Sequence, residues 1–196
     1  DDLGVIPVKE ILAKTNISEK DIDEVIIGNV AQPANAANIA RVIALKAGIP
    51  IETPAMTVHR NCASGMESIS TGAQRILSGE ANIILAGGTE SMSNIPLLFN
   101  KKMTSLFERL SKAKTIGQKL KTLLQFRLHF LKPVIGVVEG LTDPVCGLIM
   151  GLTAENIARE FHISREAQDA FALKSHLNAL KATQEGLLGE EIVSVP

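Results

Sequence analysis

The sequence predicts an α/β fold, in which strands and helices alternate around a parallel sheet, followed by a mostly helical part. Three short apolar runs, residues 24–30, 54–59 and 82–88, have the length and composition of buried strands. Helical patterns over residues 38–49 and 63–80 separate these runs. A βαβαβ order of this kind is typical of a layered parallel sheet that is covered on both faces.

Both helices of this first part carry an apolar stripe and end at a glycine. The first helix ends at Gly48, which Pro50 follows, and the second ends at Gly79. Residues three and four apart lie on one helix face, which indicates amphipathic helices. The stripes are Ile39, Val42, Ile43 and Lys46 in the first helix, and Met66, Ile69, Ala73, Ile76 and Leu77 in the second.

Residues beyond 100 change in character. An amphipathic pattern starts at Met103 and ends before Pro133, which indicates a pair of helices. Residues 133–151 are apolar and rich in Gly and Pro, as expected for an ordered loop that covers another part of the protein. Two further helices are predicted, with the N-caps Thr153 and Ser164.

Composition excludes several classes of protein. The 196 residues are 45% hydrophobic with a net charge of -1, which fits one domain, or one and a half, with a sizeable core. No apolar run reaches the roughly 18 residues of a transmembrane helix. Trp and Tyr are absent, which argues against nucleic-acid binding through aromatic stacking. Two cysteines form no disulfide framework, so we expect a cytoplasmic protein, or alternatively a mitochondrial one.

The net charge hides a strong asymmetry. The segment Lys101–Lys132 contains nine Lys or Arg and one acidic residue, Glu108, and therefore carries a charge of +8. The remainder has eleven basic and twenty acidic residues and carries -9. A charge split of this kind indicates two surfaces with different partners.

Cys62 lies where a predicted strand ends and a predicted helix begins. The first N–H groups of a helix have no internal partner and carry partial positive charge, which stabilises a thiolate and makes it a better nucleophile. The same groups can hold an oxyanion formed on an attacked thioester carbonyl. The small residues Ala63, Ser64 and Gly65 keep the approach open, and Arg60 could add positive potential.

Two other interpretations of Cys62 stay open at this point. It could be a small buried hydrophobic residue, which cysteine often is. It could also bind a metal together with His59, although a structural metal site usually needs four ligands and no further pair is nearby.

Three segments resemble the thiolase family of acyl-CoA acyltransferases. They are "VHRNCASGMESI", "GEANIILAGGTESMSNIP" and "GLTAENIAREFHISREAQDAFALKSH", and they occur in the family's order. The resemblance implies that Cys62 is the catalytic nucleophile, which takes the acyl group as a thioester. It implies cleavage of 3-ketoacyl-CoA with coenzyme A, or the reverse Claisen condensation, with coenzyme A as a substrate and no cofactor. Alternatives are a ketosynthase-type condensing enzyme and a non-catalytic assembly or binding fragment; "GGTESMS" and "TAEN" favour a thiolase.

The family is built from two similar βαβαβαββ halves, with a loop domain inserted in the first. The resemblance therefore assigns residues 1–99 to a partial N-terminal domain that carries the nucleophile, and residues 100–196 to a partial loop domain. The family's first strand is expected before Asp1. Its Gly-His-Pro histidine, its second cysteine and an asparagine that positions water are expected after Pro196. The chain alone is therefore expected to be inactive.

The resemblance also assigns substrate contacts. Leu141 and Met150 match apolar positions that line the pantetheine and acyl tunnel. Ile149 stands where short-chain biosynthetic thiolases often have His, which favours longer acyl chains and β-oxidation; an ordinary core isoleucine is an equal alternative. Cys146 is interpreted as a packing residue of the covering loop, distinct from the family's second cysteine.

The basic segment Lys101–Lys132 resembles the insertion in the β-subunit of the trifunctional β-oxidation complex. The resemblance implies docking to an α-subunit or peripheral contact with a membrane, which a basic amphipathic helix pair can make. The alternative is a helix pair that packs on its own domain and leaves its lysines in solvent. The family further implies a homo-oligomer, dimer or tetramer, and no nucleic-acid partner.

Overall fold

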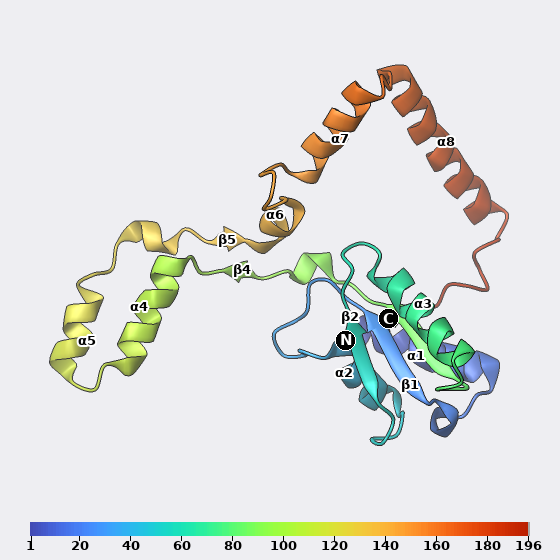
Figure 1. Cartoon of the computed structure of the whole chain (residues 1–196), viewed down its shortest axis with the longest axis horizontal. Helices are drawn as coiled ribbons and strands as arrows, with labels where there is room; N and C mark the ends of the chain where they lie inside the picture. The colour runs from blue at the N-terminus through green and yellow to red at the C-terminus, as the bar shows by residue number, and fades with distance from the viewer. Residues whose placement is uncertain (196) are drawn as a thin grey trace. The chain divides into compact units, whose positions relative to one another are not determined.

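The computed structural model describes residues 1–195, which divide into two compact units. Unit 1 comprises Asp1–Ser93 and the segment from Ala179 onward, and unit 2 comprises Asn94–Asn178. Figure 1 shows the order of the elements along the chain. Within residues 1–195, no helix combines the length and the apolar character that crossing a bilayer requires.

Unit 1 is built on a parallel sheet of three strands, as the sequence predicts. The strands are β1 (Glu24–Gly28), β2 (Ala55–Val58) and β3 (Ile84–Gly88), arranged in the order β2-β1-β3. Val25 of the central strand pairs with Ala55 on one side and with Leu85 on the other. All residues of β1 are buried, as expected for a central strand covered on both faces.

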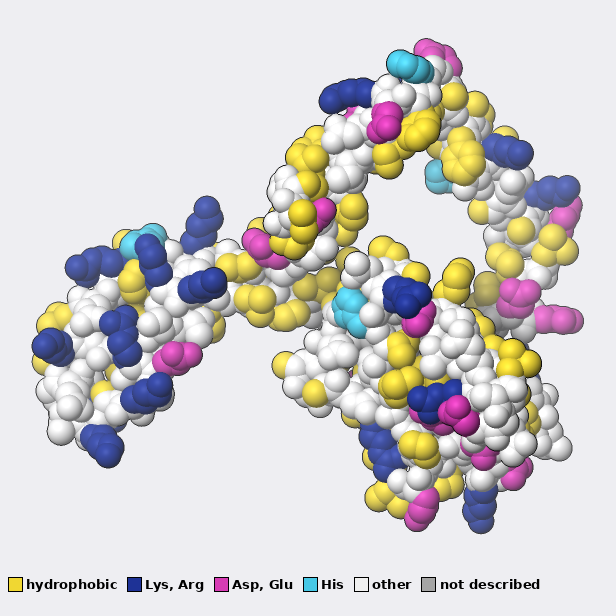
Figure 2. Space-filling model, in the orientation of Figure 1, with side chains coloured by type: hydrophobic (Ala, Val, Ile, Leu, Met, Phe, Trp, Pro, Cys, Tyr) yellow, Lys and Arg dark blue, Asp and Glu magenta, His cyan; other side chains and the backbone are white. Residues whose placement is uncertain are grey.

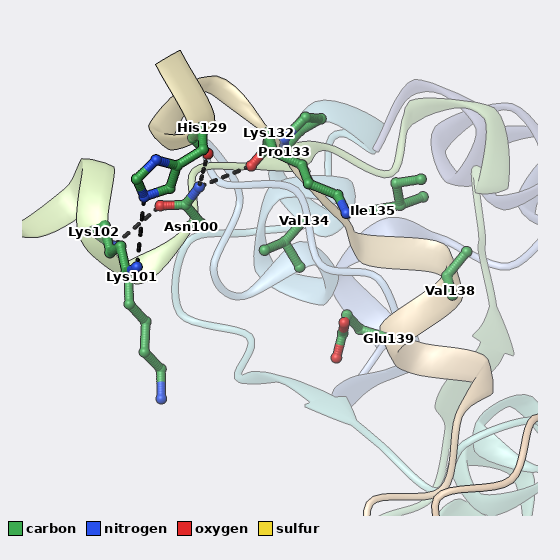
Figure 3. Close-up of a pocket in the computed structure, with 10 residues that line it drawn as sticks. All are labelled: Asn100, Lys101, Lys102, His129, Lys132, Pro133, Val134, Ile135, Val138 and Glu139. Atoms are coloured by element: carbon green, nitrogen blue, oxygen red, sulfur yellow. Dashed lines mark hydrogen bonds between the residues drawn. The ribbon is translucent and has the colours of Figure 1, made fainter. Parts of the chain in front are cut away.

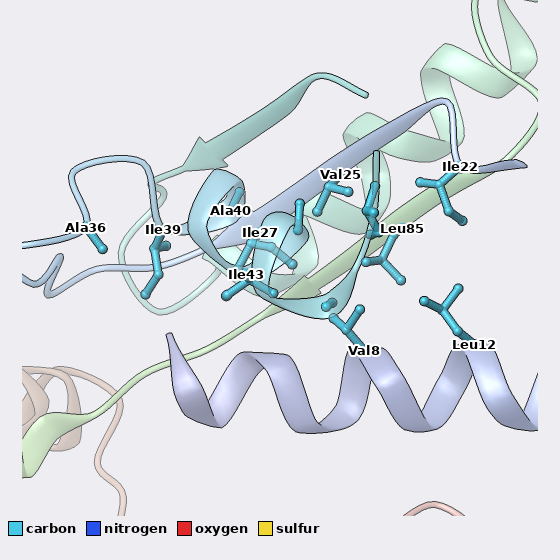
Figure 4. Close-up of a cluster of buried hydrophobic side chains, with 13 residues drawn as sticks. Val8, Leu12, Ile22, Val25, Ile27, Ala36, Ile39, Ala40, Ile43 and Leu85 are labelled. Atoms are coloured by element: carbon cyan, nitrogen blue, oxygen red, sulfur yellow. The ribbon is translucent and has the colours of Figure 1, made fainter. Parts of the chain in front are cut away.

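Helices cover the two faces of this sheet. Because side chains alternate along a strand, Val25, Ile27 and Leu85 all point to one face. There they form the core with α1 (Asp2–Thr15) and α2 (Ile39–Ala47), as Figure 4 shows. The other face, with the fully buried Ile26, is covered by α3 (Ser64–Leu77).

The face of α3 that meets the sheet consists of small residues, Ser64, Ser68 and Gly72. A Cβ atom on Gly72 would contact Ile84 at 3.2 Å and Ala86 at 3.7 Å, so this part of the helix lies directly on β3. The predicted apolar stripe faces away. Its residues Met66, Ile69 and Leu77 are 74%, 59% and 86% exposed. The helix is therefore apolar on its outer side.

Unit 2 begins with the predicted helix pair, α4 (Lys101–Lys112) and α5 (Ile116–Leu123). Leu128 and Leu131 do not continue α5 but lie in the 3₁₀-helix η3 (Leu128–Leu131). The Lys and Arg side chains of the basic segment gather over this part of the chain in Figure 2. The short strands β4 (Leu97–Leu98) and β5 (Val134–Ile135) pair antiparallel and flank the helix pair in sequence. Two further 3₁₀-helices are η1 (Glu19–Asp21) and η2 (Met92–Asn94).

Three helices complete the chain: α6 (Gly136–Leu141), α7 (Met150–Glu160) and α8 (Arg165–Gln184). The predicted loop 133–151 thus contains β5 and α6. Thr153 is not an N-cap, because α7 starts at Met150 and the Thr153 hydroxyl donates to the Met150 carbonyl at 2.6 Å. Ser164 is confirmed as the N-cap of α8, since its Oγ accepts a hydrogen bond from Ala167 N at 3.2 Å.

Candidate active site

Cys62 lies in the short turn between the end of β2 and the start of α3. The preceding residue, Asn61, has a φ of 45°, a left-handed conformation that Asn adopts more readily than most residues. The Cys62 thiol is free and exposed. The interpretation of Cys62 as a buried hydrophobic residue is therefore wrong, and its sulfur is accessible to a ligand.

Ser64, which follows Cys62, forms hydrogen bonds with the backbone that precedes Cys62. Its hydroxyl accepts a hydrogen bond from Arg60 N at 2.9 Å and donates one to Asn61 O at 2.6 Å. Its own N–H donates to the same Asn61 carbonyl at 3.1 Å. Because Ser64 is only 4% exposed, these bonds are protected from water. The hydrogen bonds of this one buried serine therefore hold the turn that contains Cys62.

The first turn of α3 carries backbone donors without a helical partner. Within residues 1–195, the N–H groups of Gly65 and Met66 form no hydrogen bond, and no side chain caps the helix. Such groups carry partial positive charge. The guanidinium of Arg60 does not simply add to this positive charge, because it forms an ion pair with Glu67 Oε2 at 3.0 Å. The expected positive potential at this turn comes from the backbone rather than from Arg60.

Two glycines that the sequence analysis missed allow α3 to start so close to the sheet. A Cβ on Gly28, at the end of β1, would lie 2.3 Å from the Ser64 carbonyl carbon. A Cβ on Gly88, at the end of β3, would lie 3.2 Å from Gly65 Cα. Both glycines lie in the apolar runs from which the strands were predicted, and each ends an observed strand. The carboxyl edge of the sheet therefore sets the position of Cys62.

A polar network ties the same edge together. Asn29 N donates to Val58 O at 3.1 Å, and its side-chain amide donates to Thr89 O at 2.7 Å. The Glu90 carboxylate accepts from Val30 N at 2.8 Å. These bonds join the end of β2 to the segments that follow β1 and β3. They keep the loops around the Cys62 turn in a fixed arrangement.

The predicted substrate contacts lie in unit 2, whereas Cys62 belongs to unit 1. Leu141 ends α6, Met150 begins α7, and an antiparallel bridge between Thr142 and Ile149 brings the two helix ends together. Leu141, Ile149 and Met150 are 42%, 39% and 53% exposed. Ile149 is thus no fully buried core residue, and all three side chains are exposed.

Cys146 does not pack in a core, and that prediction is wrong. Its side chain is exposed, and its thiol donates to Asp143 Oδ2 at 3.3 Å. Val145 N donates to the other oxygen of the same carboxylate at 2.8 Å. These contacts, with that of Val145 first, lower the pKa of Asp143. The role of Cys146 is therefore local, in a turn held by Asp143.

No cluster of three or more His, Cys, Asp or Glu side chains that could hold a metal occurs within residues 1–195. Histidine 59 instead accepts a hydrogen bond at Nδ1 from Asn61 N, at 3.4 Å, and so stabilises the turn.

Known proteins similar to this chain are thiolases. The sequence profile described as "Thiolase, N-terminal domain" matches residues 1–196. The chain is 40% identical over 193 residues to a 3-ketoacyl-CoA thiolase of Yersinia pestis, covering 98% of this chain and 44% of that protein. The same figures hold for its counterpart in Yersinia pseudotuberculosis. The chain therefore spans less than half the length of these relatives.

Two solved structures share the fold. The acetyl-CoA acetyltransferase of Bacillus anthracis is 32% identical, with a TM-score of 0.79 over 96% of this chain and 43% of its own. The Acat5 thiolase of Ascaris suum, solved in complex with coenzyme A, is 30% identical, with a TM-score of 0.82 over 98% of this chain and 45% of its own. The match of the family profile to the whole sequence, together with these similarities, shows that the chain belongs to the thiolase family. The matched part of the family is the N-terminal domain.

Proposed function

We propose that this chain supplies the nucleophile of an acyl-CoA C-acyltransferase, which transfers acyl groups through a thioester on Cys62. The observation that carries the proposal is the free, exposed Cys62 thiol at the start of α3. Its relatives are named 3-ketoacyl-CoA thiolases, and a similar structure was solved with coenzyme A, which supports acyl-CoA as substrate and coenzyme A as acyl acceptor.

In the degradative direction, the Cys62 thiolate attacks the C3 carbonyl of a 3-ketoacyl-CoA. The bond between C2 and C3 then breaks, its electron pair stays on C2, and protonation of C2 releases acetyl-CoA. The acyl group remains on Cys62 as a thioester until the thiolate of coenzyme A attacks it and forms the shortened acyl-CoA. The unpaired N–H groups of Gly65 and Met66 lie at the helix start, where such groups stabilise the negative charge on a thiolate.

The proton acceptor for this chemistry is not in contact with the nucleophile here. Within residues 1–195, no side chain forms a hydrogen bond with the Cys62 thiol. We therefore propose that the 196-residue chain alone has no thiolase turnover. A non-catalytic assembly piece is the second candidate, and the exposed apolar side of α3 favours it.

We propose that the two parts of the chain have different roles in the reaction. Residues 1–99, the partial N-terminal domain, carry the nucleophile, and residues 100–196, the partial loop domain, select the substrate. The exposed apolar side chains of Leu141, Ile149 and Met150 suit contact with an acyl or pantetheine chain. An isoleucine at position 149 favours longer acyl chains and therefore the β-oxidation direction.

Further partners are proposed from the resemblance to the thiolase family and from the positive charge of the basic segment. The full-length protein is expected to be a homo-oligomer. The basic segment Lys101–Lys132 would dock an acidic α-subunit of a β-oxidation complex or the surface of an anionic membrane. Two free cysteines fit a reducing compartment, so we propose the cytoplasm, with a mitochondrion as the alternative.

Mapping of the acyl adduct tests the assignment of Cys62. The full-length protein is incubated with acetyl-CoA and its peptides are analysed by mass spectrometry. We expect an acetyl group on Cys62, and its loss in Cys62→Ser, because a hydroxyl is hardly ionised at neutral pH. The matched control Cys146→Ser removes the other exposed thiol and should leave the adduct unchanged. An adduct that maps to Cys146, or that survives in Cys62→Ser, would exclude the proposed nucleophile.

A further inference from the structure

His59 directly follows β2, three positions before Cys62, and its side chain bonds to the backbone of the turn that contains the cysteine. Its Nδ1 accepts a hydrogen bond from Asn61 N at 3.4 Å. Asn61 is the residue immediately before Cys62 and has the left-handed φ of 45°. The bond therefore holds the peptide plane on the amino side of Asn61, whose conformation sets the direction of the chain at Cys62.

Ser64 holds the peptide plane on the other side of Asn61. Its Oγ and its N–H both donate to the Asn61 carbonyl, at 2.6 Å and 3.1 Å. Two side chains thus support the left-handed residue, one on each side of its Cα atom. Such conformations are uncommon outside glycine and persist where the surrounding structure fixes them. Loss of the bond on either side should therefore let Asn61, and Cys62 with it, leave this position.

The two supporting side chains differ in their response to pH. Ser64 is 4% exposed, and a serine hydroxyl keeps its proton at neutral pH. His59 is exposed, and histidine is the side chain that ordinarily changes its charge between about pH 5 and pH 8. An imidazole that accepts at Nδ1 is neutral, with its proton on Nε2. Protonation adds a hydrogen to Nδ1, which then faces the Asn61 N–H and can no longer accept from it.

We propose that His59 is a positioning residue for the nucleophile: neutral His59 holds the left-handed turn at Asn61, and protonated His59 releases the turn and slows acyl transfer to Cys62. This role rests on the proposed function of Cys62 as the nucleophile. His59 acts through the backbone of Asn61 and is not the proton acceptor of the reaction, since its described hydrogen bond is to Asn61 N and not to the thiol.

The charged groups on the elements that pack against β2, which are β1, α2 and α3, have other partners. In α3, Glu67 forms an ion pair with Arg60 at 3.0 Å. After β3, the Glu90 carboxylate accepts from Val30 N at 2.8 Å. The remaining pairs are Arg75 with Glu24, Arg41 with the carbonyls of Ile51 and Thr53, and Lys46 with Asp1 and Asp2.

For the part of the chain that the structure describes, no carboxylate forms an ion pair with His59. The imidazolium form therefore gains no anionic partner that would hold the side chain in place of the lost hydrogen bond. Its charge is exposed to solvent, where its effect on a nearby thiolate is small. We therefore expect the loss of the acceptor to outweigh the gain of a positive charge.

Rates of Cys62 acetylation by acetyl-CoA, measured on the full-length protein by mass spectrometry from pH 5.5 to 8.5, test the proposal. His59→Asn keeps an acceptor in the same place, because Asn Oδ1 and His Nδ1 are both bonded to Cγ, and the amide is not protonated in this range. Wild type and His59→Asn should differ by less than about two-fold at pH 8.5. At pH 5.5 wild type should be about two- to ten-fold slower, the effect of one lost hydrogen bond. Comparing the two proteins at each pH cancels the ionisation of Cys62 itself.

Two further variants separate the acceptor from shape and from charge. His59→Leu has nearly the shape of the Asn variant but no acceptor, and should be about two- to ten-fold slower than His59→Asn at every pH. His59→Lys has a permanent positive charge and no acceptor, and should be as slow as His59→Leu. A ratio of wild type to His59→Asn that does not change with pH would overturn the proposal. Either His59→Leu or His59→Lys reacting as fast as His59→Asn would overturn it too.

Alkylation of Cys62 by iodoacetamide, measured on the same four proteins, distinguishes this role from the proposed function. Alkylation needs the thiolate but no acyl transfer, and the helix start stabilises the thiolate only while the turn holds it there. The expected alkylation ratios without any acetyl adduct would support the role of His59 and count against acyl transfer alone. Ratios that are independent of pH in both reactions would overturn the role of His59 and leave the assignment of Cys62 standing.

Discussion

At the scale of single residues, the position of the Cys62 thiol depends on residues with little or no side chain. Ser64 and Gly65 begin α3 directly against Gly28 and Gly88 at the ends of two strands. A larger residue at any of these contacts would push the helix start, and the Cys62 turn with it, away from the sheet. The position of Cys62 is thus coupled to the backbone at the ends of β1 and β3.

Gly28→Ala tests this coupling. The added Cβ would lie 2.3 Å from a backbone atom of Ser64, so the helix start has to move. We expect the free energy of unfolding of the chain to fall by about 1–3 kcal/mol, as for other overpacked contacts, and the reaction rate of Cys62 with a thiol reagent to change. Urea unfolding followed by circular dichroism gives the first quantity, since the chain lacks Trp and Tyr as fluorescent probes.

Gly87→Ala is the matched control, one residue before Gly88 in the same sheet. A Cβ at Gly87 meets no atom within 4 Å, so its unfolding midpoint and its thiol reactivity should stay close to those of the parent chain. Equal effects of the two substitutions would mean that the close approach of α3 does not set the turn.

At the scale of elements, α3 differs from α1 and α2, the other helices that pack on the sheet, because its apolar stripe is on the outer side. Small residues let α3 lie close to the sheet, and Ser68 even donates a buried hydrogen bond to Gly87 O at 2.7 Å. In α2, by contrast, Ile43 is fully buried against the sheet. An apolar outer stripe of this kind is typical of a helix that is covered by a further layer of protein.

Matched Ile→Ala substitutions distinguish the two helices. Ile43→Ala in α2 should lower the free energy of unfolding of the chain by about 2–5 kcal/mol, because it leaves a cavity in the core. Ile69→Ala in α3, where the side chain is 59% exposed, should change it by less than about 0.5 kcal/mol. Chemical denaturation of both variants measures the difference. A comparable loss for Ile69→Ala would show that the outer side of α3 is already packed in this chain.

The periodicity of the sequence predicted most elements of unit 1 but not their packing. The three strands and α2 follow from apolar runs and glycine stops, since burial on both faces leaves a strong signal. Helix α1 was not predicted, because Pro7 within it interrupts a helical pattern. The buried face of α3 was also not predictable from hydrophobicity. Its small residues give no apolar signal, and only the glycines of the neighbouring strands explain why they are buried.

For the candidate site, too, the sequence predicted local structure but not tertiary contacts. The local position of Cys62 followed from a strand signal before it and a helix signal after it. The joining of α4 to η3 by Asn100 was not predicted, because it depends on contacts across about 30 positions of sequence, between Asn100 and Phe130 or Lys132. These hydrogen bonds are tertiary contacts and have no local sequence signature; Figure 3 shows the one between Asn100 and Lys132.

At the scale of the whole molecule, the two units differ in how much core each contains. Unit 1 has a contiguous cluster of buried side chains between the sheet, α1 and α2. In unit 2, the buried hydrophobic residues among those described are Met103 and Leu106, both in α4. Helix α8 has no buried residue along its whole described length. Because burial of apolar surface is the main stabilising contribution to folding, most of the stability of the chain lies in unit 1.

Amide hydrogen exchange of the 196-residue chain, followed by mass spectrometry, measures this difference. Val25, Ile26 and Ile27 of β1 are at most 4% exposed, so their amides should exchange only when the whole of unit 1 unfolds. The amides of α5 and α8, whose helices bury no side chain, should exchange through local opening and therefore much faster. Low concentrations of urea should accelerate exchange in β1 and leave α8 nearly unchanged, because global unfolding exposes far more surface than local opening. Protection of α8 equal to that of β1 would contradict this distribution, because a helix that buries no side chain would then unfold only together with the sheet.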